Sequence, residues 1–235
     1  MKRKIRKTKR KKRNKKILLK SLLLLLSLGI IPLLISLVID IPVLFNNYNR
    51  FTPEILFSVI GFLIFVVVFF LFGPPVKSYI LEHELSHVLF ALMSGVKIKS
   101  VSIRKNEGYV KTERINMVIA LAPYSFPLYT LALIGIYKIL TNFFLNPLLT
   151  AIFYLIIGVS LSFHVIATIH YVQIDQPDMK RYGYFSSLVF IFTWSLIVAA
   201  LTIALMFENV EIIEYFVNSF THTYEFYERL IMFFY

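Results

Sequence analysis

One short segment of the chain has residue types and spacing suited to metal chemistry. His83-Glu84-Leu85-Ser86-His87 has the form H-E-x-x-H. A spacing of four residues places both imidazoles on one face of a helix, one turn apart. Two neutral imidazoles placed in this way can bind one Zn²⁺, and the glutamate beside the first histidine can act as a general base on a water molecule. The pattern therefore predicts metal-assisted hydrolysis.

A site of this kind needs a third protein ligand, because two histidines leave the metal short of one. No H-x-x-G-x-x-H continuation follows His87. The chain has no cysteine, which excludes a thiolate ligand, a thiol nucleophile and a disulfide scaffold. The candidates are histidines and aspartates further along the chain: His164, His170, Asp175, Asp178 and His222.

The composition indicates a membrane protein. Of the 235 residues, 58% are hydrophobic and 16% are charged, and the mean hydropathy of +0.73 is too high for a soluble globular domain. The formal net charge of +12 is that of a tail, because residues 1–16 hold 12 of the 25 lysines and arginines and no acidic residue. We therefore expect the lipid bilayer as a partner, and no nucleic acid.

Five apolar runs are long enough to cross the hydrocarbon core, which takes about 18 residues or more. They are residues 17–39, 55–72, 115–137, 147–169 and 185–207. No small-residue cleavage site follows the first run, so we expect an uncleaved anchor rather than a signal peptide. The second run ends at Gly73-Pro74-Pro75, through which a helix cannot easily continue.

The H-E-x-x-H motif lies between the second and third runs, in a less apolar segment. We expect residues 77–94 to form a helix that ends at Gly95. Residues 96–114 alternate in side-chain type around a turn at Asn106-Glu107-Gly108, which predicts a small β-hairpin. The expected fold is an all-α polytopic membrane protein with about five transmembrane helices, a re-entrant or short helix carrying H-E-x-x-H, and this hairpin.

Positive charges predict the orientation, because lysine and arginine accumulate in cytoplasmic loops. If residues 77–94 do not cross the membrane, 22 of the 25 basic residues lie on one side. The chain then divides into a basic cytoplasmic tail (1–16), an anchor helix with an outer loop (17–54), a membrane-embedded core (55–207) and an acidic, aromatic C-terminal segment outside (208–235). The N-terminus is expected to be cytoplasmic.

The two ends of the chain have different expected environments. A run of like charges is typical of a solvated, disordered segment, and the tail can also sit on anionic lipid. The C-terminal segment, rich in glutamate and aromatic residues, is expected either to lie in the membrane interface or to pack as a terminal helix.

The same arrangement ranks the candidates for the third ligand. Asp175 and Asp178 lie at the inner end of the fourth run, on the side of His83, whereas His222 lies on the opposite side. His164 lies about two turns deeper, where a core histidine hydrogen-bonded to another helix is the competing interpretation. Ionisable groups in or beside a membrane are costly and usually mark function, which favours a metal site over a structural histidine pair.

Several stretches together resemble the site-2 protease group, the peptidase M50 family. In a membrane setting, H-E-x-x-H is followed by a hairpin and by a later aspartate at a helix end. The Pro-containing segment 121–129 is similar to one in M50B-like bacterial members. Phe163-His164, and Gln176-Pro177-Asp178 with Gly183, resemble a second block of that subgroup. The resemblance covers about residues 82–191.

The resemblance implies a zinc endopeptidase of a bacterial cell membrane, with a membrane protein or peptide as substrate. It implies that His83, His87 and Asp178 hold Zn²⁺ and that Glu84 is the catalytic base. The better-known members have a Leu-Asp-Gly sequence where this chain has Gln-Pro-Asp-Met, so Asp175 remains the alternative to Asp178.

Two other classes of function compete with hydrolysis. A non-catalytic membrane protein could keep an M50-like fold as a binding or regulatory module, and the missing Leu-Asp-Gly sequence favours this alternative. A transporter or channel would carry polar residues along several spans. The apolar runs consist mainly of leucine, isoleucine, phenylalanine and valine, which argues against transport.

Overall fold

The computed structural model describes residues 2–47, 52–104, 107–143, 146–172 and 176–235. Four helices in these ranges are long and apolar enough to cross a membrane, and a bent pair makes a possible fifth span. The four are α1 (Lys2–Ile39), α2 (Pro53–Phe72), α6 (Pro147–Val172) and α8 (Tyr184–Met206). The expected architecture, an all-α polytopic membrane protein with a small hairpin, is confirmed.

The third apolar run is broken rather than straight. It forms α4 (Met117–Leu121), the 3₁₀ turn η2 (Ala122–Tyr124) and α5 (Leu128–Thr141), and the two helical parts are bent by 76°. Proline has no amide hydrogen and clashes with the preceding helical turn, so Pro123 and Pro127 account for the break. As a result, residues 122–127 form a largely buried bend between the two helical parts.

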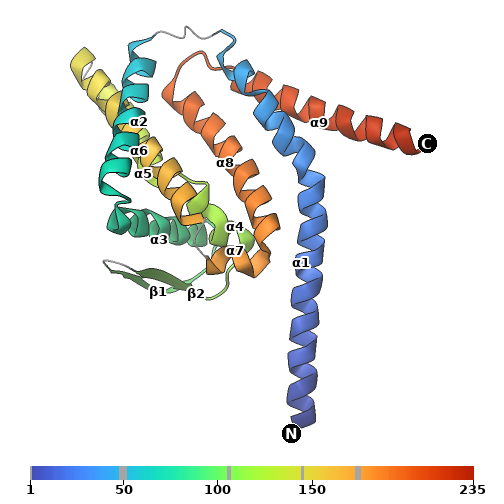
Figure 1. Ribbon diagram of the computed structural model, residues 1–235. Coiled ribbons are helices and arrows are strands. Elements are labelled where there is room, and N and C mark those ends of the chain that lie inside the picture. Colours follow the sequence, from blue (N-terminus) through green and yellow to red (C-terminus); the bar gives the residue numbers. More distant parts are fainter. Residues whose placement is uncertain (1, 48–51, 105–106, 144–145, 173–175) are drawn as a thin grey trace.

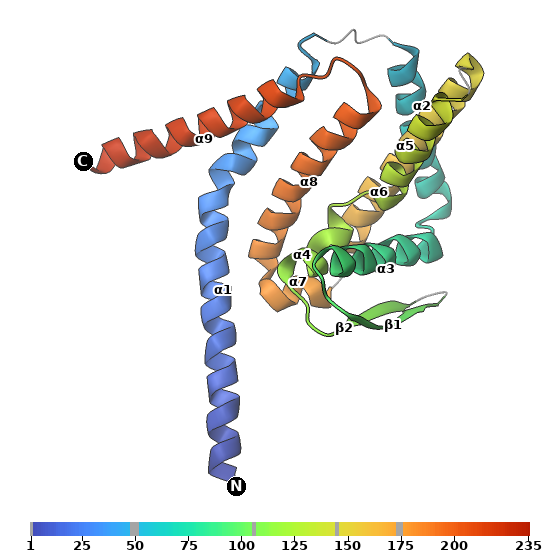
Figure 2. The ribbon, with the colours of Figure 1, turned by 180° about the vertical axis from the view of Figure 1, so that it is seen from behind.

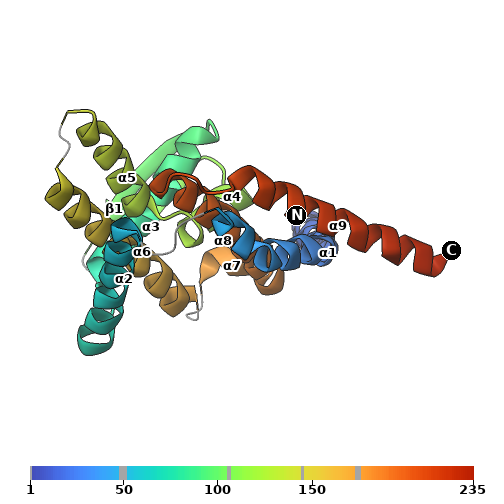
Figure 3. The ribbon, with the colours of Figure 1, turned by 90° about the horizontal axis from the view of Figure 1, so that it is seen from above.

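The long helices form two groups, which Figure 3 shows from above. In one group α2 packs along α6, and α5 also contacts α6. Glycines permit the close α2–α6 contact, because a Cβ added at Gly61 would lie 2.0 Å from the carbonyl oxygen of Leu155, and one at Gly158 would lie 2.0 Å from that of Ser58. Small residues at such a contact let two helix backbones approach closely within a membrane.

The second group contains α1, α8 and α9 (Ile212–Phe234). Helix α1 is followed by the 3₁₀ turn η1 (Ile41–Phe45), and α9 packs back on this end of α1. The Tyr215 hydroxyl donates to the carbonyl of Leu37 at 2.9 Å, and His222 Nδ1 lies 3.1 Å from Asp40 Oδ2. The C-terminal segment is therefore a helix that contacts α1 as far as Tyr227, whose hydroxyl donates to the carbonyl of Gly29. The end of α9 then diverges from α1 in Figure 1.

Helix α1 extends through the basic segment to Lys2, where we expected disorder. Lysine and arginine have high helix propensity, so a helix already formed in the apolar run can continue into them. That expectation of disorder was wrong for the backbone.

Helix α3 (Val76–Met93) carries the H-E-x-x-H motif and runs across the end of the bundle, as Figures 1 and 2 show. It is not one of the candidate spans within the described ranges. The change of direction follows Gly73-Pro74-Pro75, where Gly73 has φ +77°, a backbone conformation that favours glycine. The helix ends before Gly95, whose φ of +62° fits the expected cap.

The predicted hairpin is present. Strands β1 (Ile98–Ile103) and β2 (Gly108–Thr112) pair antiparallel, with Val101 opposite Val110 and an irregularity near Ile98. Both strands pack against α3. The N-terminal end of α1, helix α3, the hairpin and the short helix α7 (Pro177–Tyr182) all lie toward one end of the molecule in Figures 1 and 2.

The α2–α6 contact yields a stability prediction. Gly158→Ala would force a methyl group against the backbone at Ser58, so we expect the free energy of unfolding to fall by about 1–3 kcal/mol. Thermal unfolding of the purified protein in detergent measures this change. Gly135→Ala is the matched control, because its Cβ would meet nothing within 4 Å on α5. Equal stability of the two variants would contradict the proposed close packing.

Candidate metal centre

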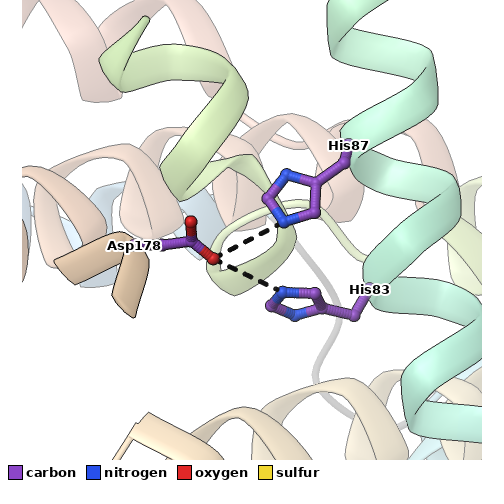
Figure 4. A group of neighbouring side chains, drawn as sticks. All are labelled: His83, His87 and Asp178. Carbon is purple, nitrogen blue, oxygen red and sulfur yellow. Dashed lines mark ion pairs between the residues drawn. The ribbon is translucent and has the colours of Figure 1, made fainter. Parts of the chain in front are cut away.

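Three side chains that are far apart in sequence converge at the bundle end (Figure 4). His83 and His87 project from consecutive turns of α3, and Asp178 comes from the first turn of α7. The Asp178 Oδ2 atom lies 3.9 Å from His83 Nε2 and 3.6 Å from His87 Nε2. One potential ligand atom from each residue lies within 4.8 Å of the others, which makes the group a candidate metal site.

The spacing of these atoms suits a metal ion better than direct contacts. A good hydrogen bond from imidazole to carboxylate spans about 2.7–3.2 Å, so both separations are too long. A tetrahedral Zn²⁺ with ligand distances of about 2.1 Å holds its ligand atoms about 3.4 Å apart. The observed 3.6 Å and 3.9 Å are close to that value. With the third separation, between the two imidazoles, within 4.8 Å, the donor set of two imidazoles and one carboxylate fits a divalent metal ion such as Zn²⁺.

The Nδ1 atoms of both imidazoles have hydrogen-bond partners. His87 Nδ1 lies 2.8 Å from the carbonyl oxygen of Ile119 in α4. Because a carbonyl oxygen only accepts, Nδ1 of His87 must carry the hydrogen, and in the neutral ring Nε2 is free to bind a metal. His83 Nδ1 lies 3.2 Å from the hydroxyl of Tyr79, one turn earlier on α3. Partners of this kind fix the orientation of metal-binding histidines.

Asp178 is held in place by the short helix that bears it. Gln176 precedes the first turn of α7, and Pro177 occupies the start, as expected for a proline at this position. Met179 and Tyr182 are buried in a cluster with residues of α4 and α8. Although burial opposes ionisation, the imidazoles of His83 and His87 hold the pKa of the Asp178 carboxyl well below its ordinary value. The lowered pKa favours the ionised carboxylate, the form that binds metal ions.

Glu84 lies beside the first histidine and has one carboxylate oxygen without a hydrogen-bond partner among the described residues. This oxygen, Oε2, is buried. The start of β2 covers the side chain, because a Cβ added at Gly108 would lie 2.6 Å from Glu84 Cγ. Burial raises the pKa of Glu84 above its ordinary value. An unpaired buried carboxylate oxygen beside three potential ligands fits a role toward water.

The neighbouring Glu82 has a different environment and does not join the group. Its Oε1 atom accepts from the backbone N–H of Tyr129 at 3.3 Å, and its Oε2 atom lies 3.4 Å from His164 Nδ1. Both side chains are buried. His164 is therefore a core histidine that joins α6 to α3, the competing interpretation given above.

The remaining candidates are placed elsewhere or fall outside the described residues. The ring of His170 packs near Phe69 and Tyr171. His222 lies beside Asp40 near the other end of α1. Asp175 lies outside the described ranges, so Asp178 is the only one of the five candidates that the described residues bring to the histidine pair.

Four features of the site were not predicted from the sequence. These are the Tyr79 hydroxyl, the Ile119 carbonyl, Gly108 as the cover of Glu84, and the Tyr124 ring, which meets the His83 ring edge-on with centroids 5.2 Å apart. The i−4 spacing of Tyr79 from His83 was a usable signal. The others depend on tertiary contacts.

Comparison with known proteins gave no match to a protein-family model, to a curated protein or to a solved structure.

The first prediction for this site concerns the third ligand. Asp178→Asn is expected to reduce the zinc content of the detergent-purified protein by about tenfold or more, because the amide is a much poorer ligand than the carboxylate. Elemental analysis after equilibration with buffered zinc provides the measurement. Asp175→Asn serves as the comparison and should keep its zinc. Loss of zinc in Asp175→Asn alone would show that Asp175, and not Asp178, is the third ligand.

The second prediction concerns the partner of His83. Tyr79→Phe removes the hydroxyl beside Nδ1 and is expected to weaken zinc affinity by about 10- to 100-fold, the usual effect of losing such a contact. Competition with a chelator measures the affinity. Tyr129→Phe is the matched control, because it removes an exposed hydroxyl contact to the same helix, at the Ser78 carbonyl, without touching the histidines. Equal affinities in both variants would count against an orienting role for Tyr79.

Proposed function

We propose that this protein is an intramembrane zinc endopeptidase that hydrolyses peptide bonds in or near transmembrane segments. The observation that carries the proposal is the convergence of His83, His87 and Asp178, with the unpaired carboxylate of Glu84 next to them. The resemblance of the H-E-x-x-H, hairpin and Gln-Pro-Asp segments to the site-2 protease group supports the same function.

Zn²⁺ bound by the three residues supplies Lewis acidity toward a water molecule and the scissile carbonyl. Glu84 takes the proton from the attacking water and delivers it to the leaving amine. The Ile119 carbonyl and the Tyr79 hydroxyl keep the imidazoles of His87 and His83 turned with Nε2 toward Asp178. The residues of the chain thus provide the base, the ligand set and its orientation.

A substrate within the membrane must unwind before its peptide bond can be attacked, because a transmembrane helix hydrogen-bonds all its amides internally. The hairpin lies against α3, and Gly108 lies directly over Glu84. An unwound stretch can pair with a free hairpin edge by strand addition, which would hold it in extended form beside the base.

The proposal extends to location. The basic N-terminal segment lies at the same end of the molecule as α3, the hairpin and α7. With the positive charges on the cytoplasmic side of a bacterial cell membrane, the site opens near the cytoplasmic face. Cleavage there would release the cytoplasmic part of a membrane protein, as in regulated intramembrane proteolysis.

The decisive variant is Glu84→Gln. Its amide cannot accept the proton, so we expect at least a 100-fold loss of cleavage with zinc content unchanged. New N-termini of membrane proteins are compared by mass spectrometry in cells expressing wild type or the variant. This comparison does not require that a substrate be known in advance. Glu107→Gln, an exposed residue at the hairpin tip, is the control and should behave as wild type.

Two results would reject the enzymatic proposal. The first is a set of new N-termini that is unchanged by Glu84→Gln. The second is a folded wild-type protein that contains no zinc and cleaves nothing, which would favour the alternative of a non-catalytic binding or regulatory module.

A further inference from the structure

Helix α9 has an apolar stripe that its packing within the protein leaves exposed. Six large apolar side chains recur along the helix at intervals of three, four or seven residues, which places them on one face. Each is between 56% and 77% exposed, and together they are Ile213, Val217, Phe220, Tyr224, Ile231 and Phe234. Within the described residues α9 is not one of the candidate spans, so a membrane crossing does not account for this stripe.

A second face of α9 is occupied by α1. The Thr223 hydroxyl lies 3.2 Å from that of Ser36, and the buried Tyr215 donates to the carbonyl of Leu37. Because each residue of a helix is rotated by about 100° from the one before it, the apolar stripe lies roughly a third of a turn away from this contact. The stripe is therefore not the surface by which α9 packs on α1.

The third face of α9 is polar. Its residues recur at intervals of three or four and are Glu214, Asn218, Thr221, Glu225 and Glu228. A helix that combines a polar face with a face of large apolar and aromatic side chains is suited to the boundary between lipid and water. The three faces of α9 thus fit three environments, which are the protein, water and lipid.

The position of α9 brings it to such a boundary. The N–H of Glu211 donates to the carbonyl of Leu44 in η1, so the helix starts at the end of α1 that lies away from α3 and the hairpin. Figure 1 shows α9 running across the direction of the lower part of α1, and Figure 3 shows it extending past α1 and away from the other helices. The exposed Ile35 and Val38, beside the contact with α9, belong to a candidate span, so the stripe adjoins a surface that faces lipid.

The charges on α9 favour apolar burial as the main interaction with a membrane. Residues 212–234 contain three glutamates and one arginine. Helices that are drawn to anionic lipid are instead rich in lysine and arginine. Arg229 also lies 3.6 Å from Glu225 on the same helix, so its charge is partly balanced within α9. Attachment of α9 to a membrane therefore requires no anionic lipid.

We propose that α9 is an interfacial helix that binds the surface of the leaflet at the end of the molecule opposite α3. Its apolar stripe is buried in the upper acyl region of zwitterionic phospholipid, and its polar face stays in water. The helix thereby fixes the depth of the end of α1 to which it is joined at Ser36 and Leu37. The proposal is independent of the endopeptidase function, because none of these residues belongs to the metal group.

The test uses the absence of cysteine in the chain, which allows a single introduced thiol to be labelled. Phe220→Cys lies in the stripe and Thr221→Cys on the polar face, and both positions are exposed. Each variant of the full chain carries a nitrobenzoxadiazole fluorophore and is placed in phosphatidylcholine nanodiscs. Brominated phosphatidylcholine is expected to quench the probe at residue 220 about fivefold more than the probe at residue 221, and aqueous iodide should show the reverse order.

Three controls accompany this comparison. Val59→Cys, on the exposed surface of the candidate span α2, is the reference for a probe in lipid. Val217→Cys and Asn218→Cys repeat the comparison about one turn earlier, which keeps the test valid if a variant at residue 220 or 221 does not fold. Replacing part of the lipid by anionic phosphatidylglycerol should leave the quenching ratio unchanged, as should a higher ionic strength.

The contrary results are distinct. Equal quenching of the two probes by iodide would mean that the stripe lies in water and would overturn the proposal. A probe at residue 220 that neither quencher reaches, with efficient disulfide formation between copies of Phe220→Cys, would assign the stripe to a second copy of the chain and would equally overturn it. A requirement for anionic lipid would reject apolar burial as the main interaction.

Discussion

The structure depends on the meeting of Asp178 with the paired histidines of α3. Each helix group contributes to this meeting, since α3 continues from α2, whereas α7 leads directly into α8. Asp178 is half-buried, and a carboxylate at such a place needs polar or positive partners, which the imidazoles of His83 and His87 can supply. The candidate site therefore draws its residues from both halves of the bundle.

Interrupted helices make this meeting possible. After Gly73-Pro74-Pro75 the chain leaves α2 and runs across the bundle end in Figure 1, and the two histidines of α3 point toward Asp178 in Figure 4. The break at Pro123 and Pro127 then places the Ile119 carbonyl and the Tyr124 ring against the histidines. In a membrane, backbone that is not helical is tolerated where it is buried in protein or lines a cavity, and the break before α5 is of that kind.

Polar groups in this apolar molecule divide into two sets. Most are satisfied within the protein, as in the Glu82–His164 pair and the Tyr215 hydroxyl on the Leu37 carbonyl. A smaller set has no partner among the described residues, and it includes one carboxylate oxygen of Glu84 and the hydroxyl of Tyr124, whose ring meets His83. Because unpaired groups are costly in such surroundings, their presence near the metal group sets this region apart from the rest of the described residues.

The sequence alone determined the membrane character, the hairpin and the pairing of His83 with His87. These follow from apolar run length, from residue alternation around a turn and from the 3.6-residue helical period, all of which are local. Tertiary structure decided which distant residue meets the histidines, since Asp178 and His164 were both open and only packing shows that His164 faces Glu82. It also decided that the third apolar run bends, that Gly108 covers Glu84, and that α9 packs on α1. Such features depend on which side chains from distant segments share a space, and no local pattern encodes that.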